Sequence, residues 1–320
     1  MFSMHFSRIF HCIYFFIVSI HFIQVYSLSS KFDNIVVFGD GNSDTVNAYN
    51  LTNHQWPLSP PYYRGRASNG PIWIDDLRIS NILNYAYVGA TIDNDNLIEG
   101  FTGPNKTIVP GIRRQIVDYL STHDVSQADL SRTLYVIWAS GTEYFLNESL
   151  TSNVIVNSLL AAIHDLLVID IKYLIVINLP PLEFYPDKHN DSRLSSLVKK
   201  HNSDLTSNLL QIQSDYEQIS VDLFDMYSFI TNLMFNQTLH LNFSEKNDSC
   251  LKITNFTLIS QCQNANEYIF IDNFHYTSVV HQLFANQIST FVFSSSVVFH
   301  VSKSLFFLSL FVFLWKKINY

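Results

Sequence analysis

The chain has 320 residues, of which 48% are hydrophobic and 14% charged. A chain of this length and composition can bury one substantial core, so we expect one large domain rather than two small ones. The net charge is −8, and lysine and arginine form no run outside the extreme C-terminus. This charge balance argues against binding to a phosphate backbone, so nucleic acid is not an expected partner.

Residues 1–28 have the layout of a secretory signal peptide. Arg8 is their only charged side chain, and the apolar stretch that follows it ends in small polar residues. We therefore expect the mature chain to begin near Ser29 and the protein to be secreted or held at the extracellular surface. A buried N-terminal helix and an uncleaved membrane anchor are the alternatives.

Short β-branched or aromatic runs alternate with helical patterns in residues 29–293. This alternation predicts a three-layer α/β/α sandwich with a mainly parallel, flavodoxin-like sheet. The runs are almost continuously apolar, as expected of strands that are covered on both faces. The predicted strands are Ile35–Phe38, Thr133–Ala139, Tyr173–Leu179 and Ile219–Phe224.

Three helices are predicted between and after these strands, at Asn153–Asp170, Leu194–Tyr216 and His275–Phe293. Apolar residues recur at helical spacing in the first two and predict their buried faces. The first face comprises Val154, Leu159, Ala162, Ile163, Leu166 and Leu167, and the second comprises Leu197, His201, Leu205, Leu209 and Ile212.

Two loops rich in proline and polar residues are expected to be irregular and to build a site. Trp56–Pro71 is long and follows the first strand, and Asn178–Pro186 lies at the carboxyl end of a strand. Long ordered loops often carry function, and open α/β sheets bind ligands at the carboxyl ends of their strands.

The cysteine count agrees with secretion. Cys12 would leave with the signal peptide, and the remaining pair, Cys250 and Cys262, is expected to form a disulfide that closes a short loop. Free thiols that bind a metal are the weaker alternative.

Eight Asn-x-Ser/Thr sequons also occur, and four of them cluster in an expected surface segment. They begin at Asn50, Asn105, Asn147, Asn190, Asn236, Asn242, Asn247 and Asn255.

Residues 294–320 form an apolar C-terminal tail. Ser304–Trp315 would span about 18 Å as a helix, which is short of the roughly 30 Å hydrocarbon core of a bilayer. Small residues at 294–296, a spacer and the apolar run resemble a signal for a glycosylphosphatidylinositol anchor. A lipid anchor, a transmembrane tail and an incidental extension all remain open, so a membrane is a conceivable partner.

Six motifs in order carry a family resemblance. They are FGDGNSDT (38–45), GRASNGPIWIDDL (65–77), NYAYVGAT (84–91), NLPPLEF (178–184), SLVKKHNSDL (196–205) and FIDNFHYTSVVHQL (270–283). Together they cover about residues 33–290, and the chain resembles the GDSL (SGNH-type) ester hydrolases of the fungal and plant type. The resemblance implies the sandwich fold predicted above and chemistry on ester-bearing small molecules, lipids or acylated glycans.

The resemblance assigns roles to five positions. His275 would be the base and Asp272 the group that orients it, while Gly89 would supply an oxyanion N–H. Gly89 as a plain turn glycine is an equal alternative. Gly41 stands where the family has its nucleophilic serine, and Thr142 stands where it has an oxyanion asparagine, with Glu143 following.

These departures leave two hypotheses. In the first, the fold and pocket are kept and ester hydrolysis is lost or strongly reduced. In the second, the protein is a working ester hydrolase, either through a substitute such as Ser43 or Ser140, or because position 41 is a sequence error for serine. A purely structural wall or adhesion protein is a third possibility with no supporting feature beyond the sequons and the tail.

Other kinds of site find no support in the sequence. It contains no glycine-rich dinucleotide or phosphate motif and no histidines at metal-ligand spacing. We therefore expect no cofactor and no metal. His164, His201 and His281 lie on predicted helices and are expected to be packed or surface residues.

Overall fold

The computed structural model describes residues 26–77, 79–124, 129–188, 191–235 and 243–297, without the side chains of 26–29 and 294–297. The chain divides into a large unit, Ser30–Val292, and a small unit made from both ends of the chain. In the small unit, β1 (Tyr26–Ser30) pairs with β13 (Phe293–Val297). Most of the predicted signal peptide and of the apolar tail lies outside the described residues.

A five-stranded sheet forms the centre of the large unit, and each adjacent pair of its strands is parallel. Four strands confirm the predicted ones, and the edge strand β3 was not predicted, because its Asn-rich sequence is only partly buried. In spatial order the strands are β3 (Asn81–Asn84), β2 (Asn34–Gly39), β6 (Thr133–Trp138), β7 (Tyr173–Ile177) and β8 (Ser220–Phe224).

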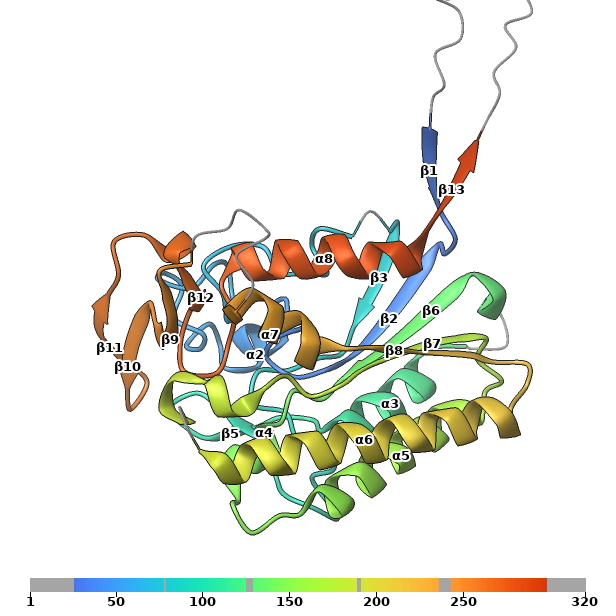
Figure 1. Ribbon diagram of the computed structural model, residues 1–320, viewed down its shortest axis with the longest axis horizontal. Coiled ribbons are helices and arrows are strands. Elements are labelled where there is room, and N and C mark those ends of the chain that lie inside the picture. The colour runs from blue at the N-terminus through green and yellow to red at the C-terminus, as the bar shows by residue number, and fades with distance from the viewer. Residues whose placement is uncertain (1–25, 78, 125–128, 189–190, 236–242, 298–320) are drawn as a thin grey trace, which may run out of the picture. The chain divides into compact units, whose positions relative to one another are not determined.

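Helices cover both faces of this sheet and complete the predicted sandwich (Figure 1). On one face lie α3 (Ile112–Thr122), α5 (Ser152–Leu167) and α6 (Ser192–Asp215). On the other lie α7 (Met226–Phe235) and α8 (Ser278–Val292). Every residue of β6 is buried, which explains why its sequence is apolar without alternation.

The predicted buried faces of α5 and α6 are each wrong at one position. Val154 is 43% exposed, and the residues after it, Ile155 and Val156, are buried instead. Leu197 is only half-buried, while Leu194 and Val198 are in the core. Neighbouring helix positions lie about 100° apart, so a small rotation of the contact face exchanges one apolar residue for the next.

An aromatic cluster fixes α8 against the sheet. Phe284 of α8 lies with its ring centroid 5.2 Å from that of Trp73 and 5.3 Å from that of Trp138. Trp138 is the last residue of β6, so this packing ties the middle of α8 to the carboxyl edge of the sheet.

A small excursion precedes α8. β9 (Glu245–Ser249) pairs in parallel with β12 (Tyr268–Phe270), and β10 (Leu251–Thr254) forms a hairpin with β11 (Thr257–Gln261). A disulfide between Cys250 and Cys262 closes this hairpin. The other short elements are α2 (Asn47–Leu51), β4 (Phe101–Thr102), β5 (Thr107–Ile108), α4 (Thr142–Leu146) and single turns at Leu130–Arg132, Leu182–Phe184, Pro186–Lys188 and Ala265–Glu267.

In the described part, the sequon asparagines Asn50, Asn105, Asn247 and Asn255 are exposed, and Asn147 is half-buried. Asn190, Asn236 and Asn242 lie outside the described residues. Among the helices of the described part, none is both long and apolar enough to cross a bilayer.

Candidate active site

A cavity of about 370 Å³ opens where the carboxyl ends of β2 and β6 meet the turn before α8. The structure brings to it all five positions that the resemblance singles out: Gly41, Gly89, Thr142, Asp272 and His275. The location agrees with the rule that open α/β sheets bind ligands beyond the carboxyl ends of their strands.

Asp272 holds the imidazole of His275 through its Nδ1 atom. Nδ1 of His275 lies 2.9 Å from each carboxylate oxygen of Asp272. The Oδ1 atom also accepts the backbone N–H groups of Phe274 and His275, both at 2.8 Å. One carboxylate therefore fixes both the turn and the ring, which is why the three-residue spacing matters.

The two groups shift each other's pKa in opposite directions. Burial alone raises the pKa of Asp272, but the charge of His275 and the hydrogen bonds to the carboxylate outweigh burial and lower it. Burial alone lowers the pKa of His275, but the charge of Asp272 and its hydrogen bond outweigh burial and raise it. Each residue therefore stabilises the charged form of the other.

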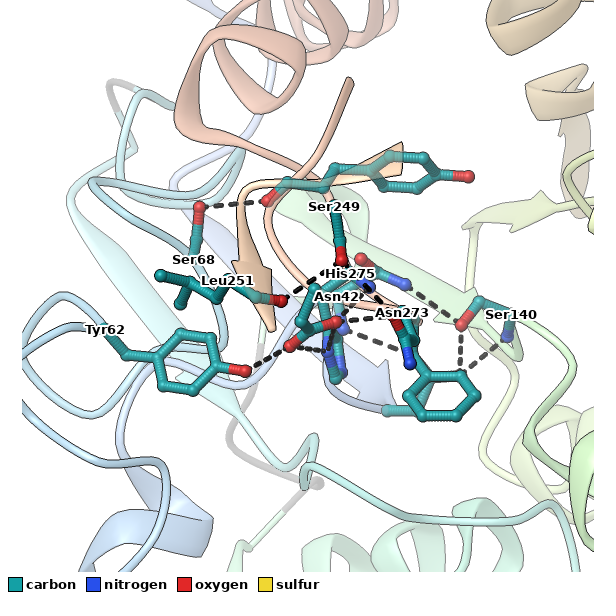
Figure 2. A network of polar contacts seen from close by, with 12 residues as sticks. Asn42, Tyr62, Ser68, Ser140, Ser249, Leu251, Asn273 and His275 are labelled. Atoms are coloured by element: carbon teal, nitrogen blue, oxygen red, sulfur yellow. Dashed lines mark hydrogen bonds and ion pairs between the residues drawn. The ribbon is translucent and has the colours of Figure 1, made fainter. Parts of the chain in front are cut away.

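Tyr62 is a further partner of this pair, and the sequence did not single it out. Its buried hydroxyl donates a hydrogen bond to Oδ2 of Asp272, and burial raises the pKa of Tyr62 well above its ordinary value. Figure 2 shows Tyr62 on one side of His275 and Ser140 on the other. Tyr62 comes from the loop Trp56–Pro71, so that loop contributes to the site as expected.

The imidazole of His275 packs directly against Gly41. An ideal Cβ atom built on Gly41 would lie 2.8 Å from Cδ2 of His275 and closer still to Nε2. Real Cβ contacts essentially never fall below 3.0 Å, so any larger residue at position 41 requires the ring to move. The φ angle of Gly41 is not positive, so the ring, and not the backbone conformation, excludes a side chain.

The backbone at position 89 requires glycine more strictly than the backbone at position 41. Its φ angle is +87°, and an added Cβ would collide with the backbone carbonyl of Phe101. Among the described residues, no group accepts a hydrogen bond from the backbone N–H of Gly89 or of Gly41. Both glycines line the cavity, so the site contains two backbone N–H groups that can donate a hydrogen bond to a ligand oxygen.

Thr142 also lines the cavity, at the start of α4, after Gly141 in a left-handed conformation. The next residue, Glu143, is buried and turned toward the Gly89 loop, where its Oε1 atom accepts the backbone N–H of Ile92 at 2.6 Å. Burial raises the pKa of Glu143 to about 7. Glu143 thus supports the loop that carries Gly89.

The two serines considered as substitutes are both hydrogen-bonded elsewhere. Ser43 is fully buried, and its Oγ atom accepts a hydrogen bond from the indole N–H of Trp73 at 3.2 Å. Ser140 does line the cavity, but its hydroxyl donates to Oδ2 of Asp40 at 2.6 Å, and its backbone N–H donates to the same oxygen at 2.7 Å. Burial raises the pKa of Asp40 despite these hydrogen bonds.

The walls of the cavity are mainly apolar and come from segments far apart in sequence. Val88 and Phe101 contribute from the first third of the chain, and the β10–β11 hairpin contributes from its last third. Of these walls, only the loop Trp56–Pro71 was predicted from the sequence as part of a site, and the hairpin was not predicted to line it. The apolar wall residues are Trp56, Tyr62, Val88, Phe101, Phe145, Leu146, Leu251, Ile253, Phe256 and Phe274.

His164, His201 and His281 lie on helices, as the helical pattern predicted. His201 and His281 are buried in helices, where burial lowers the pKa of each to about 3, and His164 is on the exposed side of α5. Within the described part of the chain, no cluster of His, Cys, Asp or Glu could hold a metal ion.

Fold and site together define a class: an α/β/α protein in which a carboxylate-bound histidine faces an apolar cavity, as in enzymes that transfer acyl groups. A family model described as GDSL-like Lipase/Acylhydrolase matches residues 35–288. The chain therefore belongs to the GDSL-like lipase/acylhydrolase family.

Individual relatives are distant. A phosphatidylcholine-sterol acyltransferase from Aeromonas hydrophila is 26% identical over 196 residues, which cover 58% of this chain and only 57% of that relative. A GDSL esterase/lipase from Arabidopsis thaliana is 23% identical over 83% of this chain and 87% of its own length. A solved member of the lipolytic G-D-S-L family from Veillonella parvula covers 80% of this chain and 96% of its own, with 13% identity and a TM-score of 0.47.

Proposed function

We propose that this protein binds the acyl part of an ester-bearing lipid or small molecule in the cavity and that serine-dependent hydrolysis is lost or strongly reduced. The observation that carries the proposal is the packing of His275 against Gly41, at the position that the family motif gives to the serine. In subtilisin, removal of the nucleophilic serine costs about 10⁶ in kcat. Thr142 stands where the family has an asparagine, so a side-chain donor of the oxyanion hole is replaced as well.

The lining of the cavity supports an acyl or lipid ligand over an acylated glycan. Ten of its side chains are apolar or aromatic, and buried apolar surface favours a hydrocarbon chain by roughly 25 cal/mol per Å². The Aeromonas hydrophila relative is named for phosphatidylcholine as its substrate, which supports the same class of ligand. The resemblance over most of the Arabidopsis thaliana relative supports a plant or fungal type of family member.

A secreted or surface location belongs to the same proposal. The disulfide between Cys250 and Cys262 is typical of oxidising compartments, and four sequon asparagines of the described part are exposed. Attachment to a membrane through residues 294–320 remains a proposal from the sequence alone.

A binding measurement tests the proposed ligand class. Trp56 lines the cavity, so its fluorescence should respond to a short-chain phosphatidylcholine below its micelle concentration, and not to an acetylated xylo-oligosaccharide. Leu146→Asp places a charge in the wall and should abolish the response. Val168→Asp changes a residue that is 79% exposed and outside the cavity, so it should have no effect. Binding of the oligosaccharide alone would contradict the proposed ligand.

A second candidate function is residual ester hydrolysis through a substitute serine. Ser140 is the observation in its favour, because this serine lines the cavity and hydrogen-bonds to a buried carboxylate. Ser140→Ala separates the two candidates, since it would abolish ester hydrolysis only if Ser140 is the nucleophile. Sequencing of codon 41 tests the other form of this hypothesis, in which residue 41 is a serine and the glycine is a sequence error.

A further inference from the structure

The turn of the β10–β11 hairpin belongs both to the wall of the cavity and to the surface. Thr254 pairs with Thr257, so Asn255 and Phe256 form a two-residue loop between the strands. Their φ angles are +48° and +60°, as a type I′ hairpin turn requires. Asparagine adopts this left-handed conformation readily, whereas a bulky aromatic residue seldom does. The Phe256 side chain therefore needs a contact that compensates for its backbone conformation.

That contact holds the turn at the cavity. The ring of Phe256 lies edge-on to the ring of Trp56, with the centroids 5.0 Å apart. Trp56 is buried, and both residues line the cavity. At the other end of the hairpin, the disulfide between Cys250 and Cys262 joins the two strands. The hairpin is thus fixed at its tip and at its base, and Asn255 is fixed beside the cavity with it.

Asn255 combines three properties of a modification site. It is exposed, it lines the cavity, and the residues Asn255, Phe256 and Thr257 form a sequon. Within the described part of the chain, its side-chain amide forms no hydrogen bond, and the Thr257 hydroxyl reaches only its backbone carbonyl, at 3.5 Å. The other sequon asparagines of the described part do not line the cavity; they are Asn50, Asn105, Asn147 and Asn247.

We propose that Asn255 carries an N-linked glycan and that this glycan limits the entry of ligands into the cavity. The inference rests on the proposed function, because the glycan is added in a secretory pathway and its effect needs a ligand that enters. It goes beyond that function by naming a modification in the wall of the site and by restricting the ligand to single molecules in solution.

The attachment step balances with a co-reactant from the secretory pathway. The donor is an oligosaccharide on a polyprenyl diphosphate. The side-chain nitrogen of Asn255 forms a bond to C1 of the first sugar, and the bond between C1 and the diphosphate oxygen breaks. The diphosphate keeps that electron pair and takes up the proton that the amide loses. The product is a neutral, strongly hydrated chain of sugars that begins beside the cavity.

Two exposed apolar side chains explain how the glycan restricts the ligand. Leu146 is 37% exposed and Phe274 is 42% exposed, and both line the same cavity as Asn255. Exposed apolar residues around a cavity favour contact with a lipid surface. A hydrated glycan at Asn255 stands between these residues and a bilayer. A single lipid molecule passes beside the glycan slowly, whereas lipid packed in a membrane does not reach the cavity.

Peptide mapping tests the modification. The full chain is produced in the secretory pathway of a eukaryotic cell and digested, and a peptide N-glycosidase then acts in water labelled with heavy oxygen. Every glycosylated asparagine becomes a labelled aspartate, and we expect the label at Asn255. Thr257→Ala removes the sequon and leaves Asn255 in its turn, so the label should disappear. Thr257→Ser keeps the sequon and is the matched control.

Two binding measurements on the same proteins test the effect of the glycan. Thr257→Ala should bind monomeric short-chain phosphatidylcholine several-fold faster than Thr257→Ser, and it should bind vesicles of long-chain phosphatidylcholine, which Thr257→Ser should not. Asn50→Gln removes an exposed sequon on α2, outside the cavity, and should behave like the native protein.

The outcomes separate this inference from the proposed function. An unmodified Asn255, or a Thr257→Ala variant that matches Thr257→Ser in either binding measurement, would overturn the inference and leave the proposed binding function intact. If none of the proteins, Thr257→Ala included, binds short-chain phosphatidylcholine, the proposed function is overturned together with the inference.

Discussion

The imidazole of His275 occupies the space beside the α-carbon of Gly41 that any side chain at position 41 would need. Glycine at this position is therefore part of how the site packs. The histidine and the carboxylate that holds its ring are both present, and the imidazole fills the space that a side chain at position 41 would take.

Gly41→Ala should destabilise the protein by about 1–3 kcal/mol, the usual cost of overpacking a buried site. The physical reason is the overlap between the new Cβ and the ring of His275. In a His275→Ala background the same substitution should cost much less, and urea denaturation of the four proteins measures this coupling. Equal costs in both backgrounds would show that the ring is not the obstacle.

Tyr62→Phe should cost about 1.5–3 kcal/mol, the range for a hydrogen bond to a charged group. Tyr62 is buried, and its hydroxyl donates to the Asp272 carboxylate, so its loss leaves that oxygen with one donor fewer. The pKa of Asp272 should rise in the variant, because the Tyr62 hydrogen bond helps to lower it. Tyr63→Phe, in the same loop but without a hydroxyl hydrogen bond among the described residues, is the matched control. If both variants unfold at the same urea concentration, the Tyr62 contact contributes nothing.

The Asp272–His275 pair should make stability depend on pH. The pKa of Asp272 is lowered, so its contribution is present above the ordinary value of about 3.9 and is lost as pH falls through the folded-state pKa. The pKa of His275 is raised, so its contribution is complete below the ordinary value of about 6.5 and is lost as pH rises through the folded-state pKa. The pair therefore stabilises most between about pH 4 and pH 6.5.

The free energy of unfolding, measured across this range for the native protein and for His275→Gln, checks the prediction. The difference between the two proteins should be largest in that window and should shrink toward alkaline pH. His164→Gln serves as the control, because this exposed histidine should give a difference that does not follow the same profile. A difference that grows with pH would contradict the assigned direction for His275.

Removal of the disulfide with Cys250→Ser and Cys262→Ser together should lower stability by roughly 3 kcal/mol, as loop closure predicts. Because Leu251 and Ile253 of the adjoining strand line the cavity, binding of short-chain phosphatidylcholine should weaken as well. Thermal denaturation and Trp fluorescence measure the two effects. Unchanged binding would mean that the hairpin holds its place without the bridge.

The sequence predicts the central layers well because both faces of the sheet are buried. β2, β6 and β7 are apolar runs, and hydrophobicity alone marks them, whereas the edge strand β8 contains Ser and Asp and is only partly buried. Hydrophobicity misses β3, which lies at the edge of the sheet and is rich in Asn. Buried helix faces are predicted to within one residue, since the final rotation depends on packing between elements.

The residues of the site also divide into those that the sequence predicts and those that only the structure reveals. Asp272, His275, Gly89 and Gly41 stand in motifs and Thr142 is assigned by the family resemblance, and the structure brings all five to one cavity. Tyr62 contacts Asp272 across 210 positions of sequence, and no local pattern encodes such a contact. The closeness of His275 to Gly41 likewise depends on how the turn before α8 meets the end of β2, so only the structure reveals it.

Labelling with a fluorophosphonate probe tests the central claim, that no serine nucleophile operates in this site. The protein as encoded should carry no probe on any serine, while Gly41→Ser should gain the label only if the ring of His275 can move aside. Peptide mapping by mass spectrometry locates any modification. Stoichiometric labelling of a serine in the unmodified protein, with Ser140 the first to inspect, would contradict the account.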